Sequence, residues 1–172
     1  MAINVSGANQ PAMAEPASPP SSPAAGFAEL LFAHVATEDI ALYEASDLAR
    51  FAAGALKRLE EPRTEPKARI TLRDETVERA GIRRELTLIE MVNDNMPFLL
   101  DSTLAELGEQ GIEPNLVAHP IVAVARDTEG GLVRVAGDAS ARAPEGTLRE
   151  SLIQIHIDWL PDPTARARPI AG

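Results

Sequence analysis

The chain has 172 residues, of which 45% are apolar, as expected for one soluble globular domain with flanking segments. Its 16 Lys and Arg against 26 Asp and Glu give a formal net charge of -10, which repels phosphate backbones and anionic lipid surfaces. The absence of cysteine excludes disulfides, thiolate nucleophiles and cysteine-ligated metal sites. We therefore expect no nucleic-acid partner.

The first 25 residues are rich in Pro, Ala and Ser. This composition buries too little apolar surface to offset the entropy of ordering, so we expect a disordered leader over residues 1–25. The leader lacks the basic start and apolar core of a secretory signal, and no apolar run approaches the roughly 20 residues that span a bilayer. These features predict a cytoplasmic protein without a membrane partner. Met13 is an alternative start to Met1.

Helical periodicity begins at Phe27 and predicts a helical lead-in over residues 26–62. Its longest helix is expected to follow Ser46 as N-cap. That helix carries apolar residues at i, i+3, i+4, i+7, i+8 and i+11, which make one continuous stripe: Leu48, Phe51, Ala52, Ala55, Leu56 and Leu59. The charged stretch EEPRTEPK then indicates a linker.

From residue 67 the apolar period falls to two, which predicts strands at ARITL and ELTLIEMVN. The second is apolar on both faces and is expected to be central. A helix follows, with Leu100, Leu104 and Leu107 on one face and a stop at Gly111. NLVAHPIVAVARD is extended, but Pro120 indicates an edge strand or a bulge. DTEGG predicts a turn that lets LVRV pair back as a hairpin.

In the last predicted strand, Ile153, Ile155, Ile157 and Trp159 alternate with Gln154, His156 and Asp158. The alternation predicts one buried and one solvated face. Together these elements predict an α+β domain over residues 67–160, an antiparallel sheet with the helix on one face, followed by a tail over 161–172. A split βαβ arrangement would supply a second helix and another strand. We therefore expect the domain to be incomplete at its C-terminus and part of a longer polypeptide.

The polar triplet before the central helix allows three interpretations. Asn95 and Pro97 fit the capping of a helix N-terminus. Asp94 and Asp101 could instead form a carboxylate pair, although no histidine or further carboxylate lies near them in sequence. Finally, free N–H groups at the helix start suit the carboxylate of a small molecule. The candidate ligand-binding residues are Asn93, Asp94, Asn95, Met96, Pro97 and Phe98.

Other catalytic signals are lacking in the sequence. His34, His119 and His156 fall on three predicted elements without metal-ligand spacing, so they are expected to be surface or packing residues, with His156 as the best exception. Ser102 and Ser151 lack the context of a nucleophile elbow. Because there is also no GxGxxG or GxxxxGK, we assign no catalytic residue, metal or cofactor to this chain.

The order of strand, Asn/Asp-x-x-Pro turn, helix, Gly-Ile and strand resembles an ACT domain, a ferredoxin-like module that commonly binds amino acids. The strings IEMVNDNMPFLLDSTLAELGEQGI, NLVAHPIVAVARDTEGGL and ESLIQIHIDWLPDP are more specific. They resemble the N-terminal ACT-like domain of the large bacterial NAD-specific glutamate dehydrogenases, and FAHVATEDIALYEASDLARFAAGALKRL resembles their helical lead-in. The resemblance covers residues 27–166.

This resemblance implies a parent enzyme that oxidises glutamate to 2-oxoglutarate with NAD, whereas the family's catalytic and NAD-binding segments lie downstream of the matched region. It implies a regulatory or assembly role, with the rest of the parent chain or a homo-oligomer as partner and a possible amino-acid effector. Amino-acid-binding ACT domains usually have Gly after the turn proline, where this chain has Phe98. Two alternatives stay open: a free-standing, dimeric amino-acid-sensing ACT module, and a small enzyme that uses Asp94 and Asp101.

Overall fold

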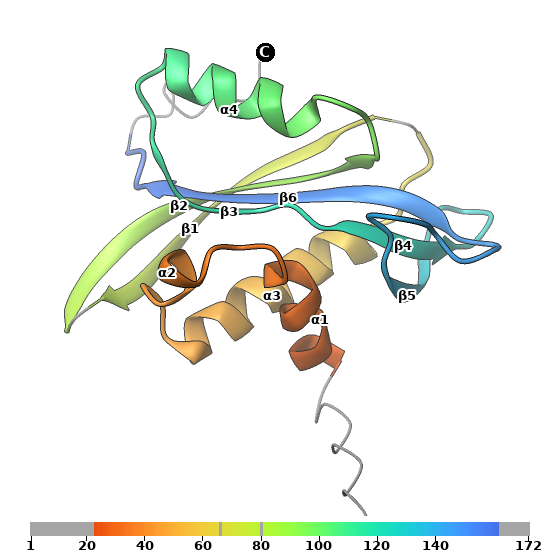
Figure 1. Ribbon diagram of the computed structural model, residues 1–172, viewed down its shortest axis with the longest axis horizontal. Helices are drawn as coiled ribbons and strands as arrows, with labels where there is room; N and C mark the ends of the chain where they lie inside the picture. The colour runs from red at the N-terminus through yellow and green to blue at the C-terminus, as the bar shows by residue number, and fades with distance from the viewer. Residues whose placement is uncertain (1–22, 66, 80, 162–172) are drawn as a thin grey trace, which may run out of the picture.

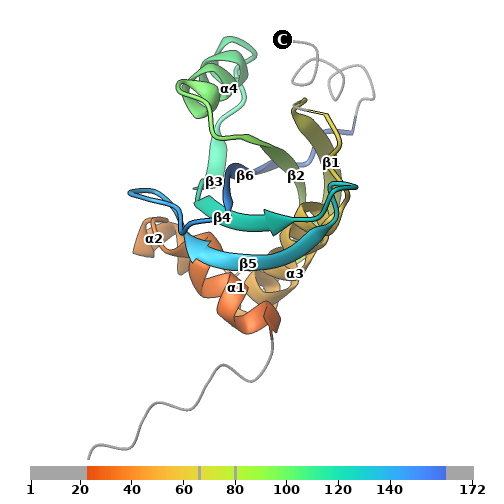
Figure 2. The same cartoon turned by 90° about the vertical axis from the view of Figure 1, so that its right-hand side faces the viewer.

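The computed structural model describes residues 23–65, 67–79 and 81–161 as one six-stranded sheet with helices on both faces (Figures 1 and 2). The leader predicted at 1–25 and the tail predicted at 161–172 thus lie mostly outside the described residues. The elements are α1 (Pro23–Phe32), α2 (Thr37–Ile40), α3 (Ala45–Glu60), β1 (Arg69–Arg79), β2 (Ile82–Asp94), α4 (Leu99–Glu109), β3 (Pro114–Ala118), β4 (Ile121–Arg126), β5 (Leu132–Asp138) and β6 (Leu148–Asp158).

The sheet has the order β1-β2-β6-β4-β5, and all of its pairings are antiparallel. The C-terminal half of β6 pairs with β3 and its N-terminal half with β4. Pro120 interrupts this edge between the two strands, because it cannot donate to the ladder. Its carbonyl still accepts a hydrogen bond from the N–H of Leu152 at 3.1 Å. The predicted interruption is confirmed: Pro120 follows β3, an edge strand that pairs with β6 alone, and precedes β4, which lies between β6 and β5.

The hairpin of β1 and β2 is longer than the sequence predicted. Only ARITL and ELTLIEMVN were expected as strands, yet pairing continues to Arg79 and Ile82. Gly81, with φ +76°, lies in the turn. The outer part of the hairpin was missed because most of its side chains are charged. The predicted central position of β2 is confirmed, since it lies between β1 and β6.

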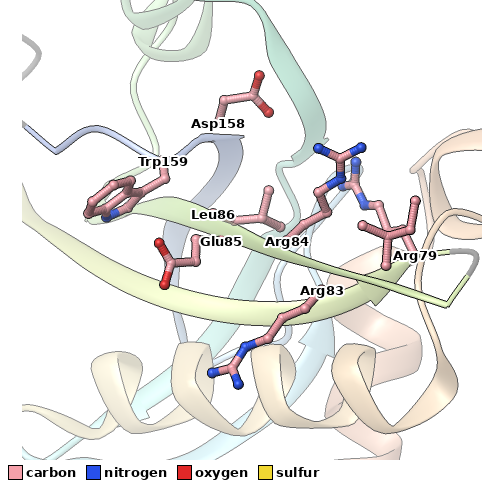
Figure 3. Close-up of a pocket in the computed structure, with 8 residues that line it drawn as sticks. Arg79, Arg83, Arg84, Glu85, Leu86, Asp158 and Trp159 are labelled. Carbon is pink, nitrogen blue, oxygen red and sulfur yellow. The ribbon is translucent and has the colours of Figure 1, made fainter.

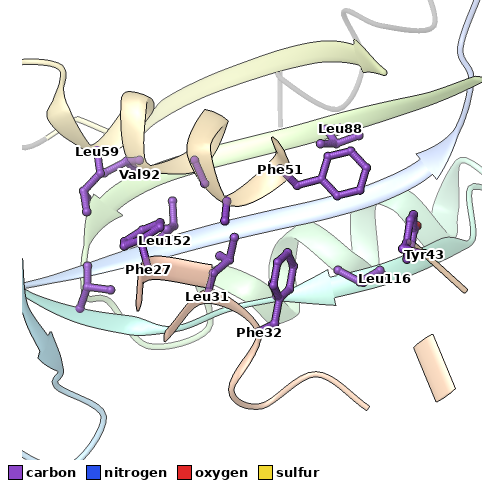
Figure 4. Packing of buried hydrophobic residues seen from close by; sticks show 14 of the residues in the cluster. Phe27, Leu31, Phe32, Tyr43, Phe51, Leu59, Leu88, Val92, Leu116 and Leu152 are labelled. Atoms are coloured by element: carbon purple, nitrogen blue, oxygen red, sulfur yellow. The ribbon is translucent and has the colours of Figure 1, made fainter. Parts of the chain in front are cut away.

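The helices α1 and α3 cover one face of the sheet (Figure 1). The predicted stripe of α3 faces the strands, and its members Phe51, Ala52, Ala55 and Leu59 are fully buried. They pack with Phe27 and Leu31 of α1 and with even-numbered residues of β2 and β6, such as Leu88 and Leu152 (Figure 4). At about 25 cal/mol per Å² of buried apolar surface, this cluster is a main source of stability.

The opposite face is covered by α4 (Figure 1). Leu107 is fully buried against the odd-numbered residues Ile89, Met91, Ile153 and Ile155. The helix ends as predicted, because Gly111 adopts φ +69° and the N–H of Ile112 returns to the carbonyl of Leu107 at 2.9 Å. The predicted α+β class and antiparallel sheet are therefore confirmed, and the lead-in helices supply the second layer of cover.

Two sequence-based expectations about this second layer were wrong. Gln154 and His156 were expected on a solvated strand face, but both are fully buried beneath the lead-in helices. The alternation of polar and apolar residues marks two chemically different buried faces here. Ser46 was expected to be the N-cap of α3, but the helix already begins at Ala45, with Glu44 as an N-cap that makes no side-chain hydrogen bond.

Candidate functional site

The candidate ligand site is the turn that joins β2 to α4. Asn93 lies opposite Ser151 near the end of the β2–β6 ladder. Beyond Asp94 the main chain stays attached to the sheet, since the N–H of Asn95 donates to the carbonyl of Arg149 at 3.1 Å. Met96 and Phe98 are exposed, at 52% and 75% respectively. The turn is thus held firmly at its strand end and is open to solvent at its helix end.

The polar triplet does not cap the helix as the sequence suggested. The N-cap of α4 is Phe98, and no side chain makes a capping hydrogen bond there. The Asn93 amide donates to the Met96 sulfur at 3.5 Å, and Asp94 accepts from Arg63 at 3.1 Å. These contacts shape the turn. They leave the N–H groups of the first turn of α4 without a side-chain partner.

Phe98 has a strained backbone. Its φ of +64° makes it the one non-glycine residue with positive φ in the described ranges. A side chain in this left-handed region costs of order 1–3 kcal/mol, which surrounding contacts must offset. The carbonyl of Phe98 accepts the first helical hydrogen bond, from Ser102 at 2.9 Å. Its exposed ring does not turn into the core.

Buried polar groups lie at the strand end of this turn. Asn93 is 5% exposed, and its Oδ1 is a buried acceptor without a hydrogen-bond partner among the described residues. Ser151, directly opposite in the ladder, shares a 2.6 Å hydrogen bond with Nε2 of His119. Burial lowers the pKa of His119, and the Asp101 carboxylate opposes the shift. Asn93, Ser151 and His119 therefore form a polar cluster at the strand end of the turn, called here the Asn93 cluster.

A buried ion cluster lies on the other face of the same strand ends. Glu150 is 2% exposed, and Arg126 binds both of its carboxylate oxygens at 2.7 Å. Arg63 from the linker reaches Glu150 at 2.8 Å and also binds Asp94. The turn after β2 is thus tied through Arg63 to the buried Glu150. Sequence reasoning missed this cluster because its members lie far apart along the chain.

The same cluster ends α3 and positions the linker. Arg126 donates to the carbonyl of Leu59 at 2.9 Å, near the negative end of the helix dipole. The linker then crosses the β4–β5 turn, where the N–H of Arg63 donates to Gly130 at 3.0 Å. A Cβ at Gly130 would lie 2.2 Å from the Arg63 carbonyl oxygen, and its φ is +79°. Only glycine fits this crossing.

His156 belongs to a second buried network on the α3 face. Its Nδ1 lies 3.0 Å from the Tyr43 hydroxyl and its Nε2 lies 3.1 Å from Oε1 of Gln154. Gln154 in turn donates to Glu90, which is held by Arg73. Burial, with smaller contributions from Arg79 and Arg73, lowers the pKa of His156 to about 3. This histidine is therefore neutral and structural at physiological pH.

The structure does not bring the remaining candidates together into a catalytic arrangement. His34 is exposed in the turn after α1, and Ser102 is exposed on α4. Asp94 pairs with Arg63, and Asp101 lies exposed in the first turn of α4. Over residues 23–65, 67–79 and 81–161, no group of three or more His, Asp or Glu side chains could hold a metal ion. None of the helices described is long and apolar enough to cross a membrane.

The sheet, the helix that follows its central strand and the strained turn between them define an ACT-type domain. Residues 27–169 match the family described as "Glutamate dehydrogenase, ACT1 domain", which covers most of the chain. The chain therefore belongs to this family.

Two relatives carry the description "NAD-specific glutamate dehydrogenase". The protein from Halomonas elongata is 35% identical over 133 residues, and the protein from Pseudomonas aeruginosa is 27% identical over 133 residues. Each alignment covers 77% of this chain but 8% of the relative. The chain thus spans a small part of the length of both proteins. No solved structure matches it.

Replacing the strained residue tests the geometry of the turn. Phe98→Gly should raise the free energy of unfolding by about 1 kcal/mol, because glycine adopts positive φ without the Cβ clash. Glycine also loses more backbone entropy on folding than phenylalanine does, which offsets part of this gain. Phe98→Ala is the matched control, since it removes the exposed ring but keeps the strain. Urea unfolding of both variants provides the measurement. A glycine variant no more stable than the alanine variant would contradict the strained geometry.

The depressed pKa of His156 should make stability pH-dependent. Below its usual value of 6.5 the unfolded chain takes up a proton at His156, whereas the folded state does not until about pH 3. Stability is therefore lost as pH falls through that window, with a slope of up to about 1.4 kcal/mol per pH unit from this one group. Thermal unfolding from about pH 7 to about pH 4.5 measures the slope, the range being chosen within the titration window.

In that experiment His156→Gln should be less stable at neutral pH but should show a shallower decline of melting temperature with acid. His34→Gln is the control, because His34 is exposed and should leave the slope as in the wild type. Equal slopes in the wild type and His156→Gln would show that His156 is not held neutral by the fold.

Proposed function

We propose that this chain is a non-catalytic regulatory segment of a large NAD-dependent glutamate dehydrogenase. The observation that carries the proposal is the family match over residues 27–169, combined with relatives of which the chain spans only 8%. The parent reaction would convert glutamate and NAD to 2-oxoglutarate, ammonia and NADH in amino-acid catabolism. In this proposal NAD and the catalytic residues belong to the rest of a cytoplasmic parent enzyme, which is also the segment's partner in assembly.

The regulatory signal would be a small amino acid bound at the turn from Asn93 to Phe98. The first-turn N–H groups of α4 have no side-chain cap, and together with the helix dipole they suit the α-carboxylate. The unpartnered Oδ1 of Asn93 suits the α-ammonium, because a buried acceptor without a donor costs roughly 1–3 kcal/mol. Met96 borders this position through its contact with Asn93.

Binding at the turn would act on the rest of the domain through contacts already described. Asp94 connects the turn to Arg63, and Arg63 connects it to Glu150 and to the linker after α3. An effector that changes the turn therefore has a direct route to the lead-in helices. Assembly of the parent enzyme through these helices or through the edge strands is the accompanying role that we propose.

Calorimetric titration of the chain with glutamate, 2-oxoglutarate and the other amino acids tests the effector. We expect saturable heat from an amino acid and an affinity at least about tenfold weaker in Asn93→Leu, which lacks the acceptor. The folded state should tolerate this change, since the lost oxygen has no partner and the lost amide makes only the 3.5 Å contact with the Met96 sulfur. Gln110→Ala, at the far end of α4, is the control and should bind as the wild type does.

The two parts of the proposal are separable in the parent enzyme that carries this segment. If the segment is regulatory, Asn93→Leu should abolish the change in glutamate oxidation that the effector produces. If an amino acid gives binding heat but does not change the rate of glutamate oxidation, the segment is a binding module without a regulatory role. No heat from any of these compounds, with a folded sample, would overturn the amino-acid site and leave assembly.

A further inference from the structure

The turn that joins β2 to α4 carries a thioether sulfur at the protein surface. Met96 is 52% exposed, whereas Met91 on β2 is 4% exposed and packs with Leu107 of α4. The other two methionines of the chain, Met1 and Met13, lie outside the residues that the structure describes. Because oxidation of methionine follows its exposure, Met96 is the methionine of the described domain that an oxidant in solution reaches first.

The sulfur of Met96 lies against a buried amide. Nδ2 of Asn93 donates to this sulfur at 3.5 Å, and Asn93 itself is only 5% exposed. Over the described ranges the sulfur is the one hydrogen-bond partner of the Asn93 side chain, because Oδ1 has none. Buried polar groups are normally well paired, but a thioether sulfur is a weak acceptor. The Asn93 amide therefore presents a poorly satisfied donor to Met96.

Oxidation of Met96 turns this weak acceptor into a stronger one. Hydrogen peroxide, a two-electron oxidant, converts the thioether to a sulfoxide and is itself reduced to water. A sulfur lone pair attacks one peroxide oxygen, the O–O bond breaks, and the departing hydroxide takes the proton of the transferred oxygen. The flexible methionine side chain can then rotate so that the polar sulfoxide oxygen replaces the sulfur opposite Nδ2 of Asn93.

The position of Met96 removes the usual cost of this modification. A methionine sulfoxide normally disrupts the apolar core or interface in which the side chain is packed. Met96 belongs to neither of the two apolar clusters that cover the faces of the sheet. Its oxidation therefore leaves the core packing intact and changes only the contact with Asn93.

We propose that Met96 is a site of reversible oxidation at which the Asn93 amide binds the sulfoxide oxygen. Methionine sulfoxide reductases return the sulfoxide to the thioether, which makes the modification reversible. The oxidised turn is held by Asn93 on one side and by the ion pair of Asp94 with Arg63 on the other. This chemistry concerns the side chain of Met96 alone and does not depend on the proposed amino-acid effector.

The rate of oxidation tests whether Met96 is the accessible methionine. The folded chain is treated with hydrogen peroxide, and tandem mass spectrometry assigns each added oxygen to an individual methionine. We expect Met96 to be oxidised at least about tenfold faster than Met91, which an oxidant reaches only when the domain opens. In concentrated urea the two rates should become similar. Equal rates in the folded chain would overturn the site.

Urea unfolding of the oxidised and the untreated chain tests the contact with Asn93. The fluorescence of Trp159, the single tryptophan, follows unfolding. Trp159 lies at the end of β6 beside Leu86 (Figure 3), whereas Met96 lies beyond the opposite end of β2, so the signal does not report the sulfoxide directly. We expect oxidation to raise the urea midpoint of the wild type, because the buried amide gains a better acceptor.

Asn93→Leu should show no such rise, since leucine offers no donor to the sulfoxide. Asn93→Ala, which also removes the donor, takes its place if the leucine variant does not fold. Met96→Leu, treated with peroxide in the same way, is the matched control and should keep its urea midpoint. A wild-type midpoint that falls or stays the same on oxidation would overturn the role of Asn93. An equal rise in the wild type and in either Asn93 variant, or in Met96→Leu, would overturn it as well.

Discussion

The buried carboxylate of Glu150 is the constraint on which the rest of the structure depends. A charge that is 2% exposed must be paired, because removing one partner of a buried ion pair typically costs about 3–5 kcal/mol. Glu150 is paired by arginines from two other segments, Arg126 of β4 and Arg63 of the linker. Meeting this one requirement fixes the end of α3, the crossing of the linker over Gly130 and the position of Asp94. The lead-in helices are thereby attached to the sheet by polar contacts as well as by apolar packing.

The remaining polar residues of β6 extend the same principle along the strand. Ser151 pairs with His119, Gln154 with Glu90 and His156 with Tyr43, so each buried group is satisfied by a different segment. Such contacts specify one arrangement of helices over the sheet, because any other arrangement would leave a buried group unpaired. Five buried side-chain atoms, on Arg58, Arg63, Arg79 and Asn93, stay without a hydrogen-bond partner among the described residues. Of these, Asn93 Oδ1 lies near the end of β2. The turn at Asn93 is the position at which we propose an amino-acid effector.

Much of the fold could be predicted from local pattern. The residues that could not be predicted have one cause in common. β2, α4 and the β4–β5 hairpin carry clear apolar periodicity or turn residues, and the structure confirms them. Gln154 and His156 looked solvated, because their burial depends on α3, about 100 residues earlier in the chain. The outer hairpin around Arg79 was missed because its alternation consists of charges. The turn at Asn93 to Phe98 was located correctly, but the strained φ of Phe98 and the contact of Asp94 with Arg63 arise from tertiary packing that no local pattern encodes.

Native-state hydrogen exchange on Glu150→Gln tests the central role of this carboxylate most directly. The variant keeps the shape of the side chain but removes the buried charge that pairs with Arg126 and Arg63, and Arg63 keeps only the exposed Asp94 as a charge partner. We predict a loss of about 3–5 kcal/mol in global stability. We also predict that the Arg63 and Asn95 amides, which lie on the two sides of the cluster, lose protection together. The Ile112 amide at the far end of α4 should lose no more protection than the loss of global stability accounts for. A loss below about 1 kcal/mol, with protection at Arg63 and Asn95 unchanged, would contradict the account, since that is the size expected of an exposed pair.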